Sequence, residues 1–317
     1  MRYVFAPLDG VTDAIFRAVH QNMFPGAERY YMPFFSPTSE HLFTPREQRQ
    51  LLPEYNRGVS AVPQILTKSA EDFLWAARGL AEMGYEEVNF NLGCPSATVA
   101  AKGKGAGLLR NPDALDKLLE EIFSRAEIRV SIKTRIGSKD ASEWEKLLTI
   151  YNRYPIAELI VHPRTREEMY KSSVHMDAFD FALQKAAMPL CYNGELFTSG
   201  DAAEFEGKYP TVPSVMLGRG AAANPSLFRE IRGGAAATRE ELYSFHTELY
   251  AAYRAEYGAQ NAMRRMKEQW YYLACLFEDG GEVRKRLVRT KDIAAFEYYV
   301  ADLFQTKALH PQLHGQL

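Results

Sequence analysis

The chain has 317 residues, of which 46% are hydrophobic and 25% are charged, and its formal net charge is -2. This length exceeds the roughly 250 residues of one α/β barrel and leaves room for a small second domain. The near-neutral charge excludes binding of a polyanion by the whole surface, so nucleic acid would need a local basic patch.

Three cysteines without a Cys-x-x-Cys pair exclude a disulfide framework and make structural zinc improbable. No run of about 20 apolar residues predicts a membrane span. We therefore expect a cytoplasmic protein, taken as a monomer, that binds neither a metal nor a membrane.

Short β-rich runs alternate with longer helical patterns as far as about Gly234. The sequence predicts eight strands, at residues 3–6, 30–34, 61–66, 87–91, 129–134, 158–161, 188–192 and 214–217. The second is the least regular, because Pro33 cannot donate to a sheet ladder. Most strands start about 30 residues after the previous one, as in βαβ repeats. Eight repeats favour the α/β class and a (β/α)8 TIM barrel over an open doubly wound sheet.

Helix caps separate these strands, and the pattern changes near the end. Ser69 precedes a predicted helix over residues 70–83, and Asn111-Pro112 opens another. Beyond Gly234 only helical periodicity remains. We therefore predict a catalytic barrel domain at residues 1–234 and an all-helical C-terminal domain at residues 235–317.

Polar residues and glycines follow seven of the eight predicted strands. In chain order they are Pro7 and Asp9, Gln64, Asn91 and Cys94, Lys133 and Arg135, His162 and Arg164, Asn193 to Glu195, and Gly218 to Gly220. The C-terminal ends of barrel strands carry the active site. The coincidence predicts one ligand site on that rim.

Each feature alone also has an ordinary structural explanation. Gly218-Arg219-Gly220 suits a tight turn as well as a phosphate site, and Asn193-Gly194 is a common turn pair. His162 is compatible with a core histidine, and Cys94 with a small apolar residue, although its Gly-Cys-Pro turn at a strand end favours a working thiol. Lys133 lies between Ile132 and Thr134, and a buried lysine needs an anionic or electron-rich partner.

Taken in order, these residues resemble the dihydrouridine synthases, flavoenzymes that reduce uridine in transfer RNA. The matching segments are 6–13, Gln64, 89–96, 105–109, 133–135, 162–165, 193–195 and 218–220. The Asn-Leu-Gly-Cys-Pro block at residues 91–95 is highly specific. The resemblance runs from about Tyr3 to Phe228 and continues more weakly to about Val300.

The resemblance implies a tRNA-dihydrouridine synthase that uses flavin mononucleotide (FMN), recharged by NADPH. The residues implied to surround FMN are Pro7, Gln64, Lys133, His162, Asn193, Gly194, Glu195, Gly218 and Arg219. Lys133 and His162 would lie near the isoalloxazine and ribityl groups. The loops at Asn193 and Gly218-Arg219 would hold the phosphate.

Cys94 is implied to be the general acid. Reduction of the uracil C5–C6 bond needs a hydride at C6, which flavin N5 supplies, and a proton at C5. A neutral thiol with a pKa near the ordinary ~8.5 can give that proton at neutral pH. Lys133 can stabilise negative charge on a carbonyl oxygen.

A uridine must leave its stack to reach the flavin, and contacts with the RNA backbone need cations. The segment from Arg264 to Lys291 is locally basic, which suits either an RNA surface or a solvated helix face with pairs such as Arg264–Glu268. The resemblance favours RNA. The residues expected to contact tRNA are Asn91, Arg135, Arg164, Lys102, Lys104, Arg264, Arg265 and Lys267.

Two departures from the family pattern concern substrate position rather than chemistry. Leu8-Asp9 stands where Met-Glu is common, and Pro163 stands where Gly is common. Neither change removes a charged or catalytic group, and the uridine that is modified stays open.

Two alternative functions remain. One is a flavin barrel that acts on a free pyrimidine, similar to dihydroorotate dehydrogenase, against which the basic helical tail argues. The other is a non-catalytic tRNA-binding protein, against which the set of Cys94, Lys133 and His162 argues.

Overall fold

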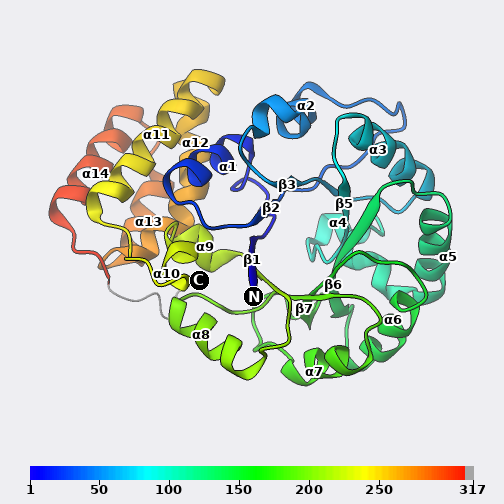
Figure 1. Cartoon of the computed structure of the whole chain (residues 1–317). Helices are drawn as coiled ribbons and strands as arrows, with labels where there is room; N and C mark the ends of the chain where they lie inside the picture. Colours follow the sequence, from blue (N-terminus) through cyan, green and yellow to red (C-terminus); the bar gives the residue numbers. More distant parts are fainter. Residues whose placement is uncertain (311–317) are drawn as a thin grey trace.

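The computed structural model describes residues 1–310 and contains a barrel of parallel strands surrounded by helices (Figure 1). The strands are β1 (Arg2–Phe5), β2 (Arg29–Tyr31), β3 (Ala61–Val62), β4 (Gln64–Ile65), β5 (Glu87–Leu92), β6 (Arg129–Gly137), β7 (Leu159–Thr165), β8 (Leu190–Tyr192) and β9 (Ser214–Leu217). Their order in the sheet is β3-β2-β1-β9-β8-β7-β6-β5-β4. Since β3 and β4 are consecutive pieces of one extended segment, the two ends of this order meet. The chain therefore has the predicted TIM-barrel fold.

Pro63 divides the third predicted strand into β3 and β4. Proline has no N–H to donate to a neighbouring strand. β3 pairs with β2 and β4 pairs with β5, so the segment changes partners across the proline. The second predicted strand is shorter than expected, because β2 ends at Tyr31 and does not continue through Pro33.

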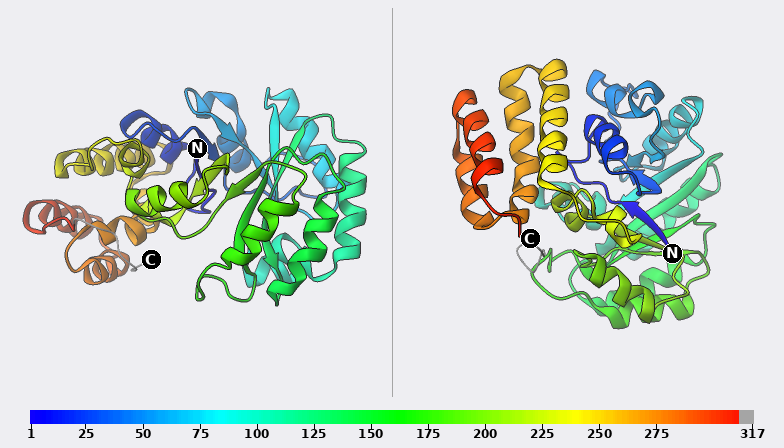
Figure 2. Two further views of the ribbon diagram at one scale, coloured as in Figure 1. Left: turned by 60° about the horizontal axis from the view of Figure 1, so that its bottom comes forward. Right: turned by 60° about the vertical axis from the view of Figure 1, so that its left-hand side comes forward.

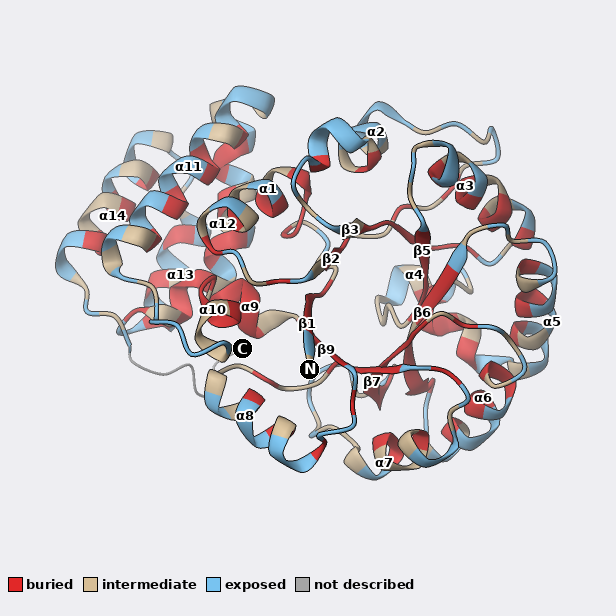
Figure 3. Cartoon of the chain, in the orientation of Figure 1, coloured by how far each residue is buried: buried red, intermediate tan, exposed pale blue. Residues whose placement is uncertain are grey.

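Helices cover the outside of the barrel and extend to one side of it. They are α1 (Ala14–Met23), α2 (Pro45–Leu51), α3 (Ala70–Glu82), α4 (Ala97–Ala101), α5 (Pro112–Phe123), α6 (Trp144–Tyr151), α7 (Met176–Lys185), α8 (Ser199–Lys208), α9 (Arg219–Ala223), α10 (Leu227–Ile231), α11 (Arg239–Tyr257), α12 (Ala259–Leu273), α13 (Gly280–Arg289) and α14 (Ile293–Thr306). Their buried faces point toward the strands and their exposed faces point outward (Figure 3).

Local sequence explains where the covering helices begin. Asn111 caps α5 by accepting a hydrogen bond from the N–H of Ala114, and Pro112 occupies the first turn, where a missing N–H costs nothing. The α5 stripe of Leu115, Leu118, Leu119 and Ile122 is buried. Burial of one such apolar side chain stabilises the fold by about 1.5–3 kcal/mol.

Helices α11 to α14 form a separate group beside the barrel (Figure 2). Their core includes Trp270, which is fully buried and donates from Nε1 to Nδ1 of His246. The predicted boundary at residues 234 and 235 lies between α10 and α11, and the division into two domains stays a prediction. Within residues 1–310, no helix combines the length and the apolar character needed to cross a lipid bilayer.

Candidate active site at the barrel mouth

Strand register brings the predicted site residues together at the C-terminal strand ends, which we call the mouth. Asn91 on β5 is paired with Lys133 on β6, and Arg135 on β6 is paired with His162 on β7. Neighbouring parallel strands therefore present these side chains at one end of the barrel. Pro7, half-buried, follows β1 at the same end.

A chain of buried amides lies under the mouth. Gln64 donates from Nε2 to Oδ1 of Asn89 (2.7 Å) and accepts at Oε1 from Nδ2 of Asn91 (2.7 Å). Asn89 in turn donates to the hydroxyl of Ser131 at 2.9 Å. Gln64 was predicted to bind the cofactor, and its amide is already engaged with these two asparagines. Asn89 lies in the matching segment 89–96 without an individual role, and Ser131 had no predicted role; the alternating polar residues of Asn89-Phe90-Asn91 were the signal in the sequence.

The amide chain continues into the turn that carries Cys94. Asn91 accepts at Oδ1 from the backbone N–H groups of Gly93 (3.1 Å) and Cys94 (2.9 Å). Arg135 donates from Nε to the Gly93 carbonyl at 3.0 Å. Gly105, at φ +57°, packs so closely that an added Cβ would lie 3.0 Å from the Cys94 Cβ. The backbone that carries the thiol is thus held in one place at the end of β5.

The surroundings of Cys94 favour the neutral thiol. Burial raises the pKa of Cys94, and the nearby Asp9 carboxylate raises it further, while the Ser96 backbone, Arg135 and Lys133 act in the opposite direction without reversing the shift. A half-buried thiol of this kind is a proton donor at neutral pH rather than a thiolate nucleophile.

Lys133 brings an ammonium group into the mouth without a protein partner. Among residues 1–310 its ammonium forms no hydrogen bond and no ion pair. Burial lowers the pKa of Lys133 to about 7, and the Arg135 guanidinium lowers it as well. A desolvated cation of this kind fits an anionic or electron-rich ligand.

His162 is a neutral hydrogen-bonding group. Burial holds the pKa of His162 well below its ordinary value, and the cations Arg135, Lys133 and Arg164 add to the effect. Its Nε2 lies 3.2 Å from a guanidinium nitrogen of Arg164, so Nε2 accepts and the proton of the neutral ring is assigned to Nδ1.

Arg135 and Arg164 form the walls of the mouth rather than its outer surface. Arg135 is 1% exposed and donates to the carbonyls of Thr165 and Met169, and Arg164 is 0% exposed and pairs with Glu195 at 2.5 Å. They were predicted to contact tRNA. Their burial limits any such contact to a group that has entered the mouth, and the contact itself stays a prediction.

The loops after β8 and β9 pack against each other with room only for glycine. A Cβ on Gly220 would lie 2.5 Å from the Leu196 carbonyl oxygen, and one on Gly194 would lie 1.8 Å from the Tyr192 hydroxyl. Asn193, directly after β8, donates from Nδ2 to the carbonyl of Met216 in β9 at 2.8 Å. Close backbone approach at the start of α9 offers N–H groups of the kind that bind phosphate.

Charged side chains connect the same two loops. Glu195 lies 3.6 Å from Arg219, which also stacks over Tyr170 with its guanidinium carbon 4.5 Å from the ring centre. Gly218 is less constrained than its neighbours, because an added Cβ would meet Ala6 only at 3.5 Å.

Two groups of cations lie outside the mouth. Lys102 and Lys104 follow α4, and burial lowers the pKa of Lys104, as do the charges of Lys102 and Lys68. Lys68 had no predicted role. On the helical group, Arg264 and Lys291 lie near enough to Lys267 to lower its pKa together with burial.

Two of the cations expected to contact tRNA behave differently from each other. Arg264 is exposed and makes no ion pair with Glu268 or any other residue within the described chain, so the alternative of i,i+4 pairing is not realised there. Arg265 forms an ion pair with Asp13 at 2.7 Å. Its guanidinium is therefore already paired with a carboxylate of the barrel.

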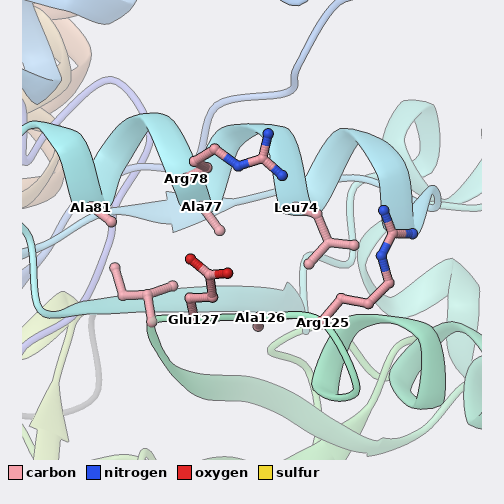
Figure 4. A pocket seen from close by; sticks show the side chains of 8 residues that line it. Leu74, Ala77, Arg78, Ala81, Arg125, Ala126 and Glu127 are labelled. Carbon is pink, nitrogen blue, oxygen red and sulfur yellow. The ribbon is translucent and has the colours of Figure 1, made fainter.

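Two cavities differ in their position relative to the mouth. One of about 380 Å³ lies beside the mouth, between Asp9, Phe34, Arg46 and Arg265. The other, of about 60 Å³, lies between α3 and the segment that leads into β6 (Figure 4). It is at the opposite end of the barrel from Cys94 and is too small for a nucleotide.

Comparison with protein families gives one match along nearly the whole chain. The profile of the dihydrouridine synthase (Dus) family matches residues 4–304. A probable tRNA-dihydrouridine synthase of Staphylococcus epidermidis is 29% identical over 309 residues, covering 92% of this chain and 90% of the relative. A probable tRNA-dihydrouridine synthase of Staphylococcus aureus strain Mu50 is 30% identical over 302 residues with the same coverage. The tRNA-dihydrouridine synthase B of Pasteurella multocida is 29% identical, covering 72% of this chain and 68% of the relative.

Solved structures with the same architecture are more distant in sequence. Morphinone reductase aligns with a TM-score of 0.54 at 13% identity, over 75% of this chain and 87% of that one. The TcOYE structure aligns with a TM-score of 0.56 at 9% identity, over 77% and 92%. At such identities these matches establish the barrel fold alone.

Proposed function

The chain belongs to the dihydrouridine synthase family, and from this membership we propose that it reduces the C5–C6 bond of specific uridines in tRNA, with FMN as cofactor and NADPH as reductant. The observation that carries the proposal is that Cys94, whose pKa is raised by burial, lies at the same barrel mouth as the Lys133 amine, which has no hydrogen-bond or ion-pair partner among residues 1–310.

The residues present fit FMN. The ammonium of Lys133 has no hydrogen-bond or ion-pair partner in the described part of the chain and suits the electron-rich ring system. Neutral His162 offers a hydrogen bond beside it. The close packing of Gly220 against the Leu196 carbonyl brings the start of α9 near the loop after β8, and backbone N–H groups there suit the phosphate.

Bound at the mouth, FMN would supply the hydride that adds to C6 of the uracil ring. Cys94 would donate its proton to C5, and the backbone hydrogen bonds from Gly93 and Cys94 to Asn91 keep the thiol in position for that transfer. Lys133 would stabilise negative charge on a carbonyl oxygen of the ring, where its desolvated charge acts strongly.

The target uridine would reach this mouth as an unstacked nucleotide, because the site lies at the end of a closed barrel. Two groups of cations would hold the RNA backbone on either side of it. One is Lys68, Lys102 and Lys104 beside the Cys94 turn, and the other is Arg264, Lys267 and Lys291 on the helical group.

The test uses purified protein, its visible absorption spectrum, and an assay for dihydrouridine in unmodified tRNA with NADPH. Wild type, Cys94→Ala and Cys275→Ala are compared, because Cys275 is a buried cysteine of the helical group outside the site. We expect all three to be yellow. Cys94→Ala should lose about 10²- to 10⁴-fold in rate, as for removal of a general acid, and Cys275→Ala should not.

Other outcomes would redirect or end the proposal. A colourless wild-type protein that cannot be loaded with FMN would refute the cofactor. A yellow protein that reduces a free pyrimidine but leaves tRNA unchanged would move the substrate to a small molecule. An active Cys94→Ala would remove the thiol from the mechanism.

A further inference from the structure

One buried carboxylate joins the barrel to the helical group. Asp13 ends the loop after β1, and its side chain is 7% exposed. Its Oδ1 accepts from the Tyr253 hydroxyl on α11 (3.0 Å) and from the N–H of Phe16 on α1 (2.9 Å). Its Oδ2 accepts from the Arg265 guanidinium on α12 at 2.7 Å. A single side chain thus contacts three helices.

The same loop is held at a second point. Gln269, one turn after Arg265 on α12, donates from Nε2 to the Val11 carbonyl at 2.7 Å. The Arg265 guanidinium is itself placed over the Tyr257 ring, 4.1 Å from its centre. The Tyr257 contact places the side chain that pairs with Asp13, so α12 meets the loop at two points, Val11 and Asp13.

The loop and the helix both reach the mouth. Asp9, in the same loop as Asp13, is close enough to Cys94 to raise its pKa. On α12, Cγ of Glu268 lies 3.9 Å from the Cβ position of Gly10. Tyr272, further along α12, interacts electrostatically with Tyr170 and Arg219 at the mouth. Helix α12 is therefore a wall of the mouth as well as part of the helical group.

We propose that Asp13, acting through Arg265 and Tyr253, is a positioning residue that fixes the helical group on the barrel, so that bound tRNA presents its uridine to Cys94 in one orientation. This inference rests on the proposed function. It also gives Arg265, expected from the sequence to contact tRNA, a role inside the protein.

Charge explains why the contact is specific. Burial raises the pKa of Asp13, and the Phe16 N–H, Arg265 and the Tyr253 hydroxyl lower it. A buried carboxylate is tolerated only when it is paired and hydrogen-bonded. The buried carboxylate therefore depends on the contacts from Tyr253 on α11 and Arg265 on α12, which couples the loop at the mouth to the orientation of the helices.

The test compares Asp13→Asn and Tyr253→Phe with wild type. Asparagine keeps the helix cap at Phe16 and removes the charge. Tyr253 is fully buried and cannot touch RNA directly. We measure KM and kcat for tRNA, and separately the rate of flavin reduction by NADPH without tRNA. The KM for tRNA should rise about tenfold in Asp13→Asn and less in Tyr253→Phe, as for loss of a hydrogen bond to a charged group. Flavin reduction should be unchanged.

A matched control and a double variant separate positioning from general damage. Arg254→Gln removes an ion pair with Glu297 (2.8 Å) that lies entirely within the helical group, and its KM should stay at the wild-type value. Asp13→Asn combined with Arg265→Gln should be no worse than the stronger single variant, since both remove one interaction. Arg265→Lys, which keeps a positive charge beside Asp13, should have a KM for tRNA closer to wild type than Arg265→Gln.

Three outcomes would overturn the inference. They are an unchanged KM in Asp13→Asn, additive effects in the double variant, or equal slowing of flavin reduction and tRNA turnover. Amide hydrogen exchange at residues 11–13 supplies a readout that needs no activity, and it should accelerate in Asp13→Asn but not in Arg254→Gln. If wild type makes no dihydrouridine, the proposed function fails, and unchanged exchange would then refute the Asp13 contact independently.

Discussion

At the scale of single residues, the unusual feature is the charge of Lys133. Its pKa of about 7 lies below the ordinary 10.5, because burial and Arg135 disfavour the charged form. The folded protein without flavin therefore binds fewer protons than the unfolded chain between those values. The free energy of unfolding is therefore highest, as far as Lys133 is concerned, above pH 10.5, and it decreases as the pH falls toward 7.

This shift predicts that FMN binding takes up a proton. At pH 8 most Lys133 side chains are neutral in the free protein, and an anionic or electron-rich ligand raises the pKa of the amine. Isothermal titration of FMN in two buffers with different ionisation enthalpies measures the uptake. We expect close to one proton per FMN at pH 8 in wild type and in Lys146→Met, an exposed lysine on α6. Equal uptake in Lys133→Met would contradict the assignment.

Residue types and their spacing were enough to predict most of the site, but not the partners of its buried members. Cys94, Lys133 and His162 stand out in the sequence because each lies at or just after the end of a predicted strand. Arg135 looks the same on that criterion, yet its guanidinium is bound by carbonyls of residues 93, 165 and 169. Such partners come from separate loops and carry no side-chain signal.

At the scale of elements, the polar residues of the site make the ends of two strands hard to predict from the sequence. β6 continues to Gly137 and β7 to Thr165, where the sequence predicted ends at Thr134 and Val161. Lys133 to Arg135 and His162 to Arg164 break the apolar pattern of a buried strand. Hydrogen bonding to the neighbouring strand still maintains the extended backbone. At these two strand ends, pairing with the neighbouring strand overrides the local preference of the residues. At Pro63 the difference runs the other way, because a segment predicted as one strand is interrupted.

The loops after β8 and β9 give a prediction for this scale. Gly220→Ala places a Cβ about 2.5 Å from the Leu196 carbonyl, which must push the two loops apart. We expect a loss of about 1–3 kcal/mol in the free energy of unfolding, measured by urea titration. We also expect a fall in FMN affinity, measured by flavin fluorescence.

Gly207→Ala is the matched control. It lies in α8 with no atom within 4 Å of an added Cβ, and alanine there should stabilise the helix by roughly 0.5–1 kcal/mol. If Gly220→Ala bound FMN as tightly as Gly207→Ala, close packing of the two loops would not be needed for the phosphate.

At the scale of the whole molecule, the charge distribution determines how a chain with net charge -2 could hold RNA. The cations are not spread evenly. Arg264, Lys267 and Lys291 lie together on the helical group, and Lys68, Lys102 and Lys104 lie together beside the Cys94 turn. Sequence analysis predicted most of these residues but not their grouping, because Lys68 and Lys291 come close to the others only through the fold.

Local clusters of this kind predict salt dependence for the tRNA reaction alone. Each phosphate contact releases condensed counterions, so the logarithm of KM for tRNA should rise linearly with the logarithm of salt concentration. NADPH oxidation without tRNA should change little over the same range. Arg264→Gln should lower the salt slope by about 1, the effect of losing one phosphate contact. Lys146→Gln, which removes an exposed cation from the outside of the barrel, should leave the slope unchanged. If both variants kept the wild-type slope, Arg264 would lie outside the RNA contact, and the cluster beside Cys94 would have to supply the electrostatic attraction.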